Sequence, residues 1–305
     1  GSSFFAQVSV AQAVEFSLAA WPTRNVMGCQ ASKRSCIKGA MSCEDGKPDF
    51  EHVTDFLPID ASKKIMSSVV LGEDPSSAHF APRQKAIRFA MVINGRVLAL
   101  TQDFFHQSSK YNEFSGGYKR TYSLIDEQLF HGPLGEMILK FATYYNIPEK
   151  TVILAQIQRS FFNDEYMDNT LSVTGQGIHT DGADRAVIVG LDRGRKIVGA
   201  CNQFHAKLDG SQPLCKPIPL GNGECIFFKD NRIYHYVTPA QVETETKDDV
   251  DSNGLESSRA ILIMHAPAEM YLNGAVNEAN NLGAREGSIK LRYGVRSVVS
   301  AGDHA

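Results

Sequence analysis

The sequence contains no long apolar run, no marked excess of charge of either sign, and only one tryptophan. A membrane-spanning helix needs about 20 consecutive apolar residues, and no segment approaches that length. The 31 basic residues against 34 acidic residues give a formal net charge of −3, whereas a nucleic-acid-binding domain is typically basic. We therefore expect a small-molecule ligand, and neither a membrane nor a nucleic acid as a partner.

The chain also has few cysteines and no Cys-x-x-Cys pair, which argues against a disulfide-stabilised scaffold. Cys29, Cys36 and Cys43 recur every seven residues, but they lie in a loop-like stretch at residues 24–49 without the spacing typical of zinc ligands. The first residues lack the basic region of a signal peptide. We expect free thiols and a cytoplasmic location.

The residue pattern changes near residue 83, and this change predicts two regions. Residues 1–82 are expected to form a helical and loop-like extension that packs on the core. Apolar residues at helical spacing predict a helix over residues 8–20, and Asp60 is positioned to cap a second helix at 61–70. Residues 83–305 are expected to form the main domain, which is rich in β-branched runs.

The predicted core consists of short strands separated by turns. Asn94-Gly95, between two apolar runs, is a strong signal for a β-hairpin. Residues 123–145 return to helical spacing, with a break at Gly132-Pro133. Further strand-like runs follow: TVILAQIQRSFF (151–162), RAVIVGL (185–191), KIVGACNQFHAKL (196–208), CIFFK (225–229), YHYVT (234–238) and AILIMHA (260–266). Short strands without intervening helices favour an antiparallel sandwich or barrel.

Two segments near the end of the chain interrupt this pattern. Residues 242–258 are acidic and free of aromatic residues, so we interpret them as a solvated insertion between two strands. Residues 274–283 contain a possible further helix.

The sharpest local pattern is Gly-Ile-His-Thr-Asp-Gly, which contains His179 and Asp181. Residues two apart in a strand point to the same side, so this imidazole and this carboxylate can face one point. A further histidine, His235, lies in a strand–turn–strand pattern downstream. Two histidines and one carboxylate form the facial triad of non-haem Fe(II) oxygenases, which leaves positions open on the metal.

An oxygenase that uses a 2-oxo acid also needs a cation for the distal carboxylate of that acid. Arg259 opens the strand that follows the acidic insertion. Its planar guanidinium suits a bidentate contact with a carboxylate.

Four segments together resemble the 2-oxoglutarate/Fe(II) dioxygenase family that includes bacterial L-isoleucine dioxygenase and related free amino-acid hydroxylases. The resemblance covers roughly residues 83–267. The segments are FFHQSSKYNEFSGGYKR (104–120), GIHTDGADRAVIVGLDR (177–193), GNGECIFFKDNRIYHYVTP (221–239) and SSRAILIMHAP (257–267). Two features depart from the family pattern: the spacing from His235 to Arg259 is longer, and the first eighty residues have no counterpart.

This resemblance implies a double-stranded β-helix, a jelly-roll fold similar to that of cupins, with flanking helices. It implies His179, Asp181 and His235 as catalytic iron ligands, and Arg259 as the residue that binds 2-oxoglutarate. Fe(II) would be the cofactor, and 2-oxoglutarate and O2 the cosubstrates. The substrate would be a small free amino acid, with an aliphatic one favoured, and the reaction would be hydroxylation of an unactivated C–H bond.

An amino-acid substrate requires a cation and polar neighbours in the same pocket. Arg120 is the first choice for the substrate carboxylate and Arg159 the second. Tyr111 and Asn112 lie in the same loop as Arg120, and Gln156 lies on a strand whose polar face, shared with Gln158, could line a pocket.

Other interpretations remain open at this point. The same iron chemistry could lead to desaturation or to oxidative C–N ring closure, such as aziridine formation from a valine-like amino acid. The three ligands could also serve a metal hydrolase, or a cupin-like binding module without turnover. His205 and His265 lack a carboxylate two residues away, so we expect both to be core or rim histidines. The oligomeric state is not predicted.

Overall fold

The computed structural model describes residues 46–74, 82–112, 116–117, 119–162, 173–174, 176–243 and 257–273. Several expected features lie outside these residues: the helices at 8–20 and 274–283, the three cysteines of the 24–49 loop, and residues 244–256 of the acidic insertion. Within the described part, Cys201, Cys215 and Cys225 are free thiols, as expected. No described helix is both long enough and apolar enough to cross a membrane.

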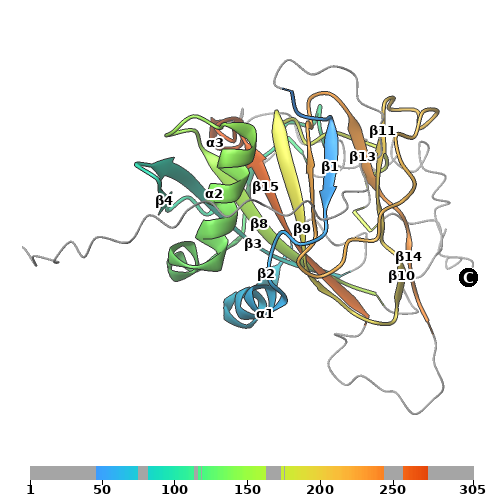
Figure 1. Ribbon diagram of the computed structural model, residues 1–305, viewed down its shortest axis with the longest axis horizontal. Helices are drawn as coiled ribbons and strands as arrows, with labels where there is room; N and C mark the ends of the chain where they lie inside the picture. Colours follow the sequence, from blue (N-terminus) through green and yellow to red (C-terminus); the bar gives the residue numbers. More distant parts are fainter. Residues whose placement is uncertain are drawn as a thin grey trace, which may run out of the picture. The chain divides into compact units, whose positions relative to one another are not determined.

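The architecture is mainly antiparallel β, and one large sheet forms its centre (Figure 1). The strand order in this sheet is β1-β12-β9-β15-β8-β3-β2, and β4 and β7 also pair with β3. The strands are β1 (Phe50–Val53), β2 (Gly72–Glu73), β3 (Arg83–Ile93), β4 (Arg96–Ala99), β7 (Ser123–Leu124), β8 (Ile153–Phe161), β9 (Arg185–Arg193), β12 (Cys225–Phe228) and β15 (Ser258–Ala266). Most neighbours in this order are far apart in the sequence, so the chain crosses the core repeatedly.

Shorter strand pairs complete the fold. They are β5 (Phe104–His106) with β6 (Lys119–Thr121), β10 (Ile197–Gly199) with β14 (Ala240–Val242), and β11 (Asn202–His205) with β13 (Tyr234–Val237). In Figure 1, β10, β11, β13 and β14 lie on the side of the large sheet away from α2. This arrangement is the predicted double-stranded β-helix with flanking helices.

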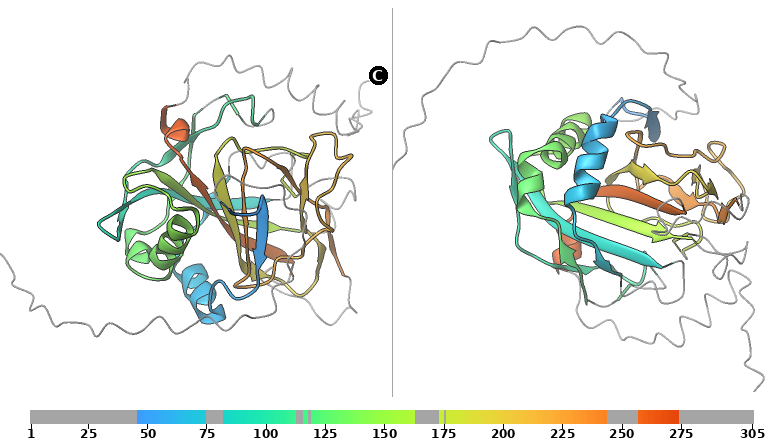
Figure 2. Two further views of the ribbon diagram at one scale, coloured as in Figure 1. Left: turned by 45° about the horizontal axis from the view of Figure 1, so that its top comes forward. Right: turned by 90° about the horizontal axis from the view of Figure 1, so that it is seen from below.

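Two helices cover the other face of the large sheet (Figure 2). They are α1 (Ile59–Ser68) and α2 (Pro133–Tyr145), and a 3-10 helix (Glu127–His131) precedes α2. The buried side of α2 presents Leu134, Met137, Ile138 and Phe141, which join one apolar cluster with residues of β8, β9, β12 and β15. Burying a side chain of this size contributes about 1.5–3 kcal/mol, so this interface anchors the sheet that carries the site.

The Asn94-Gly95 hairpin forms between β3 and β4 as predicted. Asn94 has φ 50° and Gly95 has φ 69°, the left-handed values that a two-residue hairpin turn requires. The predicted strand at 196–208 is divided into β10 and β11, because Ala200 between them adopts φ 47°. The expected cap of the helix predicted at 61–70 is also corrected: Pro58 precedes α1, and Asp60 lies in its first turn.

Alternation along β12 separates two aromatic side chains. Phe227 stacks on Tyr144 of α2 with ring centres 3.9 Å apart. Phe228 points to the opposite face, where its ring centre lies 5.2 Å from that of His235. Phe228 thus places an apolar ring beside the polar residues of the site described below.

Candidate metal centre and its cavity

His179 and His235 face each other across an isolated antiparallel bridge. The amide of each residue donates to the carbonyl of the other, at 3.0 Å from His179 and at 2.8 Å from His235. This double hydrogen bond brings the two ring centres within 4.1 Å of each other. Two residues that are far apart in the sequence are therefore held as a pair by the backbone.

Asp181 lies beside both histidines. Its Oδ1 is 3.8 Å from His179 Nε2, and its Oδ2 is 3.5 Å from His235 Nε2. One ligand atom from each of the three residues lies within 4.8 Å of the others, a spacing that can hold a metal ion. His179 Nδ1 is 2.8 Å from the carbonyl oxygen of Gly177. That contact assigns the proton to Nδ1 and leaves the Nε2 lone pair for a metal.

Asp230, which was not identified from the sequence, contacts the backbone next to Asp181 and the side chain of His235. Its fully buried carboxylate accepts hydrogen bonds from the amides of Asp181, Gly182 and Ala183, at 2.7–3.1 Å. Asp230 Oδ1 also lies 3.2 Å from His235 Nδ1. One carboxylate thus fixes both the loop of one ligand and the ring of another.

Three further side chains hold Asp181 in place. His265 Nε2 lies 3.0 Å from Asp181 Oδ2, and His265 Nδ1 lies 3.3 Å from Gln156 Nε2. Gln107 donates to Oδ1 and to the carbonyl of Asp181, at 3.3 and 3.1 Å. Tyr271 donates to the same carbonyl at 3.1 Å. His265 is buried, as expected, but it contacts the metal cluster, because β15 passes next to the Asp181 loop.

The protonation states of His179 and Asp181 suit metal binding. Burial, together with the nearby His235 ring, lowers the pKa of His179 from 6.5 to about 4. Burial opposes ionisation of Asp181, but the hydrogen bond from His265 and the surrounding imidazoles hold the pKa of Asp181 well below its ordinary value. Burial also disfavours the charged form of His235, but Asp230 and Asp181 outweigh it and raise the pKa of His235. At neutral pH, His179 is neutral and Asp181 is ionised.

We predict that Asp230→Asn weakens metal binding and destabilises the fold. The amide cannot accept the same set of backbone hydrogen bonds, and hydrogen bonds to charged groups contribute about 1.5–3 kcal/mol each. We expect an Fe(II) affinity lower by about 10–100-fold, the usual effect of losing a residue that orients a ligand. Anaerobic Fe(II) titration and chemical denaturation measure the two effects. Asp184→Asn is the matched control, because Asp184 forms an exposed contact with Asn231; an unchanged affinity in Asp230→Asn contradicts the assignment.

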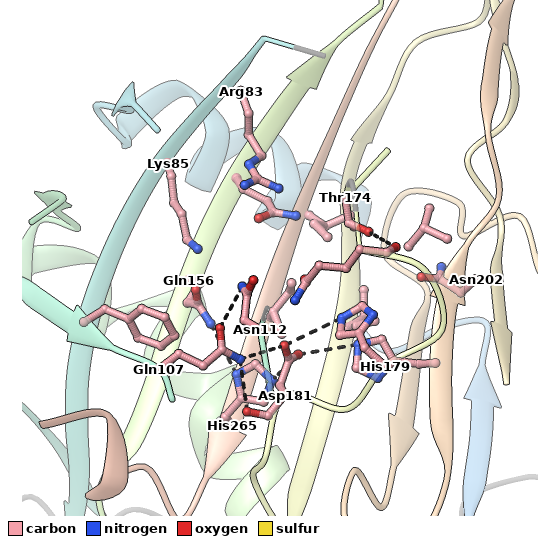
Figure 3. A pocket seen from close by; sticks show the side chains of 18 of the residues that line it. Arg83, Lys85, Gln107, Asn112, Gln156, Thr174, His179, Asp181, Asn202 and His265 are labelled. Atoms are coloured by element: carbon pink, nitrogen blue, oxygen red, sulfur yellow. Dashed lines mark hydrogen bonds and ion pairs between the residues drawn. The ribbon is translucent and has the colours of Figure 1, made fainter. Parts of the chain in front are cut away.

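The metal cluster lies in the wall of a cavity (Figure 3). Arg259, on β15, also lines the cavity and is 4% exposed. Its only hydrogen bond to a described residue is with Asn202 Oδ1 at 3.4 Å, and no described carboxylate pairs with it. Burial and the nearby Arg193 lower the pKa of Arg259 from 12.5 to about 10, so this guanidinium remains charged at neutral pH.

The cavity includes some of the predicted substrate residues and excludes others. Arg120, Asn112, Gln156 and Gln158 line it. Arg159 points to the opposite face of β8 and pairs with Asp192 Oδ2 at 2.8 Å. This placement corrects the expectation that Arg159 binds the substrate, because side chains one residue apart on a strand face opposite sides.

Tyr111 is also not among the residues that line the cavity. Its ring packs against Gly182, where a Cβ would lie only 2.7 Å from the ring, and Gly182 has φ 93°. Both observations require glycine at that position. Tyr111 therefore contacts the loop that carries Asp181, which corrects its expected place beside the substrate.

Arg83 and Lys85 of β3 also line the cavity and were not identified from the sequence. Arg83 Nε pairs with the buried Asp74 Oδ2 at 2.7 Å. In Figure 3 both β3 side chains lie above Asp181, and Lys85 lies on the side of the view opposite Asn202. In the strand-like run RQKAIRF (83–89), Arg83 and Lys85 are two residues apart, so they could have been predicted to share one face of a strand. The same pattern is typical of an exposed strand face, so it did not indicate a cavity.

The 2OG-Fe dioxygenase family profile matches residues 68–250. This match covers more than half of the chain and includes the His-x-Asp segment and His235. No curated protein matches the chain in sequence.

Solved structures show a similar fold. A bsmA homologue from Methylobium petroleophilum PM1 has a TM-score of 0.54 at 18% identity, covering 71% of this chain and 87% of that one. IDO from Bacillus thuringiensis has a TM-score of 0.50 at 15% identity, covering 71% of this chain and 89% of that one. On the strength of the family match, the chain belongs to the 2OG-Fe dioxygenases, which use Fe(II) and 2-oxoglutarate.

Proposed function

We propose that this dioxygenase oxidises an unactivated C–H bond of a small free amino acid, with hydroxylation as the outcome. In this proposal His179, Asp181 and His235 bind the iron, and Arg259 binds the distal carboxylate of 2-oxoglutarate. The observation that carries the proposal is a single cavity that contains both the His-Asp-His cluster and a buried arginine without a carboxylate partner among the described residues.

The residues fit these two groups chemically. Imidazole and carboxylate ligands in a two-to-one ratio suit Fe(II) in oxygenases. Arg259 Nε is buried and has no hydrogen-bond partner among the described residues, and an unsatisfied buried charge is costly unless it is paired. A carboxylate that accepts from the Arg259 fork would satisfy it.

When bound, Fe(II) with 2-oxoglutarate and O2 supplies the oxidising power, and 2-oxoglutarate is converted to succinate and CO2. The chain's own residues hold and orient the reactants. Asp230 and His265 keep the ligand side chains in place, and Arg259 fixes one end of 2-oxoglutarate. Ile188, Ile261 and Ile263 line the same cavity and limit the access of water, which strengthens each polar contact.

The other half of the cavity is proposed to hold the amino acid. Arg120 is 4% exposed, lies over the Phe105 ring with its Cζ 4.7 Å from the ring centre, and lines the cavity with Asn112 and Gln156. Arg120 would contact the substrate carboxylate, and the amide oxygens could accept hydrogen bonds from the ammonium group.

Succinate formation across a panel of free amino acids, with Fe(II), ascorbate and 2-oxoglutarate, tests the proposed function. Mass spectrometry of the product separates the outcomes. Hydroxylation adds one oxygen atom, whereas desaturation or C–N ring closure removes two hydrogen atoms. Turnover of a peptide or a nucleic acid, with no free amino acid accepted, would overturn the substrate class.

We predict that Arg120→Ala raises the KM for the amino acid by at least about 30-fold, the effect of losing a charge-assisted contact of about 2 kcal/mol. The KM for 2-oxoglutarate should change little, because Arg259 remains. Steady-state kinetics with each substrate varied in turn measures both constants. Arg96→Ala, which removes an exposed arginine on β4, is the control, and an unchanged amino-acid KM in Arg120→Ala contradicts the placement.

A further inference from the structure

We propose that Lys85 is a further anion-binding residue of the cavity, beside Arg120, and binds a carboxylate of the substrate separately from the Arg259 site. The identity of the substrate as an amino acid rests on the proposed function above. The chemical class of the bound group does not, because it follows from the surroundings of Lys85.

Strand pairing directs Lys85 into the cavity. Lys85 on β3 pairs in register with Gln158 on β8, and Ile87 pairs with Gln156. Partners in register share one face of the sheet, and Lys85, Gln156 and Gln158 all line the cavity. Figure 3 shows the Lys85 side chain extending toward Gln156. An ammonium and two amide groups thus lie along one wall.

Lys85 is buried and has no anion partner among the described residues. Lys85 is 7% exposed and forms no ion pair or hydrogen bond with any described residue. Two aromatic rings lie close to it: Nζ is 4.9 Å from the centre of the Tyr122 ring and 5.6 Å from that of Phe105. Asp74, an acid whose charge acts on Lys85, is paired with Arg83 at 2.7 Å.

A buried ammonium in these surroundings is unfavourable by itself. Burial lowers the pKa of Lys85 from 10.5 to about 7, against the attraction of Asp74 and Asp181 and together with the repulsion from Arg83 and Arg120. A protein keeps such a group at low cost only when a partner neutralises it. A bound carboxylate would do so, and the amide groups of Gln156 and Gln158 could donate further hydrogen bonds to it.

The cations of the cavity differ in position, as separate binding of 2-oxoglutarate and substrate requires. Asn202, which contacts Arg259, and Lys85 lie on opposite sides of Asp181 in Figure 3. Arg120 contacts the same Phe105 ring as Lys85. Two positively charged side chains therefore lie in the part of the cavity that is proposed to hold the substrate. The substrate carboxylate, or a second carboxylate on its side chain, is the group that Lys85 would hold.

The test compares wild-type protein with Lys85→Met, Lys85→Arg and the control Lys63→Met, which removes an exposed lysine of α1. Each protein, loaded anaerobically with Fe(II) and 2-oxoglutarate, is titrated calorimetrically with three sets of probes. The first set contains aliphatic and acidic amino acids, the second their carboxamides, and the third the corresponding carboxylic acids without the amino group. Binding of 2-oxoglutarate to the Fe(II) protein is measured in parallel.

We expect Lys85→Met to bind carboxylate probes at least about 30-fold more weakly than wild type. Lys85→Arg should recover part of the affinity, and Lys63→Met should match wild type. The carboxamides should bind weakly to all four proteins. Affinity for 2-oxoglutarate should stay within about twofold in Lys85→Met, because its distal carboxylate is assigned to Arg259. A greater loss for acidic than for aliphatic amino acids identifies a side-chain carboxylate as the bound group.

The outcomes separate this inference from the proposed function. If amino acids are turned over and Lys85→Met binds them as wild type does, the Lys85 site is wrong and the function stands. If the deaminated acids bind in a Lys85-dependent manner and no amino acid does, the function is wrong and the site stands. Loss of 2-oxoglutarate affinity in Lys85→Met, or no Lys85-dependent binding of any carboxylate probe, overturns the inference.

Thermal unfolding gives a second readout that distinguishes ligand binding from a structural role. The unfolded chain binds more protons than the folded protein between pH 7 and 10.5, because Lys85 has these two pKa values in the two states. The loss of folding free energy caused by burying the charged Lys85 side chain is therefore fully present below pH 7. It disappears as the pH approaches 10.5. Lys85→Met should raise Tm without ligand, most at pH 6 and least at pH 10. A lower Tm at pH 6 would show that Lys85 stabilises the fold and would overturn the inference.

Discussion

Replacing any one of the proposed iron ligands, as in His179→Ala, Asp181→Ala or His235→Ala, should abolish succinate formation. Each substitution removes one of three donors that converge within 4.8 Å. Because loss of a residue that merely orients a ligand costs about 10–100-fold in metal affinity, loss of a ligand itself should cost more than about 100-fold. Anaerobic Fe(II) titration and a succinate assay measure the two effects.

The fold should survive these three substitutions, because none of the three side chains belongs to an apolar core cluster. Circular dichroism and thermal unfolding check this expectation. His131→Ala is the control, since His131 is an exposed residue at the end of the 3-10 helix. Full activity in any of the three variants, with iron still bound, would refute the ligand assignment.

Arg259→Ala should raise the KM for 2-oxoglutarate far more than it weakens iron binding. Truncating one partner of a buried charge pair costs about 2–5 kcal/mol, which corresponds to about 30-fold or more in affinity. Fe(II) affinity should stay close to that of wild type, because Arg259 contacts none of the three ligands in the described structure. Steady-state kinetics with 2-oxoglutarate varied, and Fe(II) titration without it, provide the comparison.

Arg232→Ala is the matched control for this prediction. Arg232 is partly exposed and pairs with Asp49 Oδ1 at 3.0 Å, and neither Arg232 nor Arg185 lines the cavity. In the sequence, these two arginines are the nearest others to the proposed iron ligands and were therefore the alternatives to Arg259. An unchanged 2-oxoglutarate KM in Arg259→Ala would therefore transfer the role to another cation of the cavity, with Lys85 as the first alternative.

Local sequence patterns predicted most of the elements correctly. The Asn94-Gly95 turn, α2 after Gly132-Pro133, and the strands β8, β9, β12 and β15 form where their patterns place them. These elements depend on turn chemistry and on periodicity within about ten residues. β1 was not predicted, because FEHV has no distinctive pattern and becomes a strand by pairing with β12.

The same limit applies to the site. His179 and Asp181 are two residues apart, so a local pattern could indicate them. Asp230 and His265 could not be identified as their partners, because their contacts with Asp181 arise from β12, β13 and β15 passing the same loop. Arg159 was misplaced for a related reason: the choice between the two faces of β8 depends on which face is covered by α2 and which lines the cavity.

The sequence by itself indicated the β-rich class and the His-x-Asp pair through spacings of a few residues, and it indicated His235 and Arg259 through the strand-like runs in which they lie. Only the tertiary structure decided which polar side chains share one cavity with them. Burial and charge pairing depend on strand order and register across more than a hundred residues. For this reason Lys85, an ordinary lysine in the sequence, becomes a buried side chain with no anion partner among the described residues, whereas Arg159, an equally plausible cation, is paired with Asp192 on the other face.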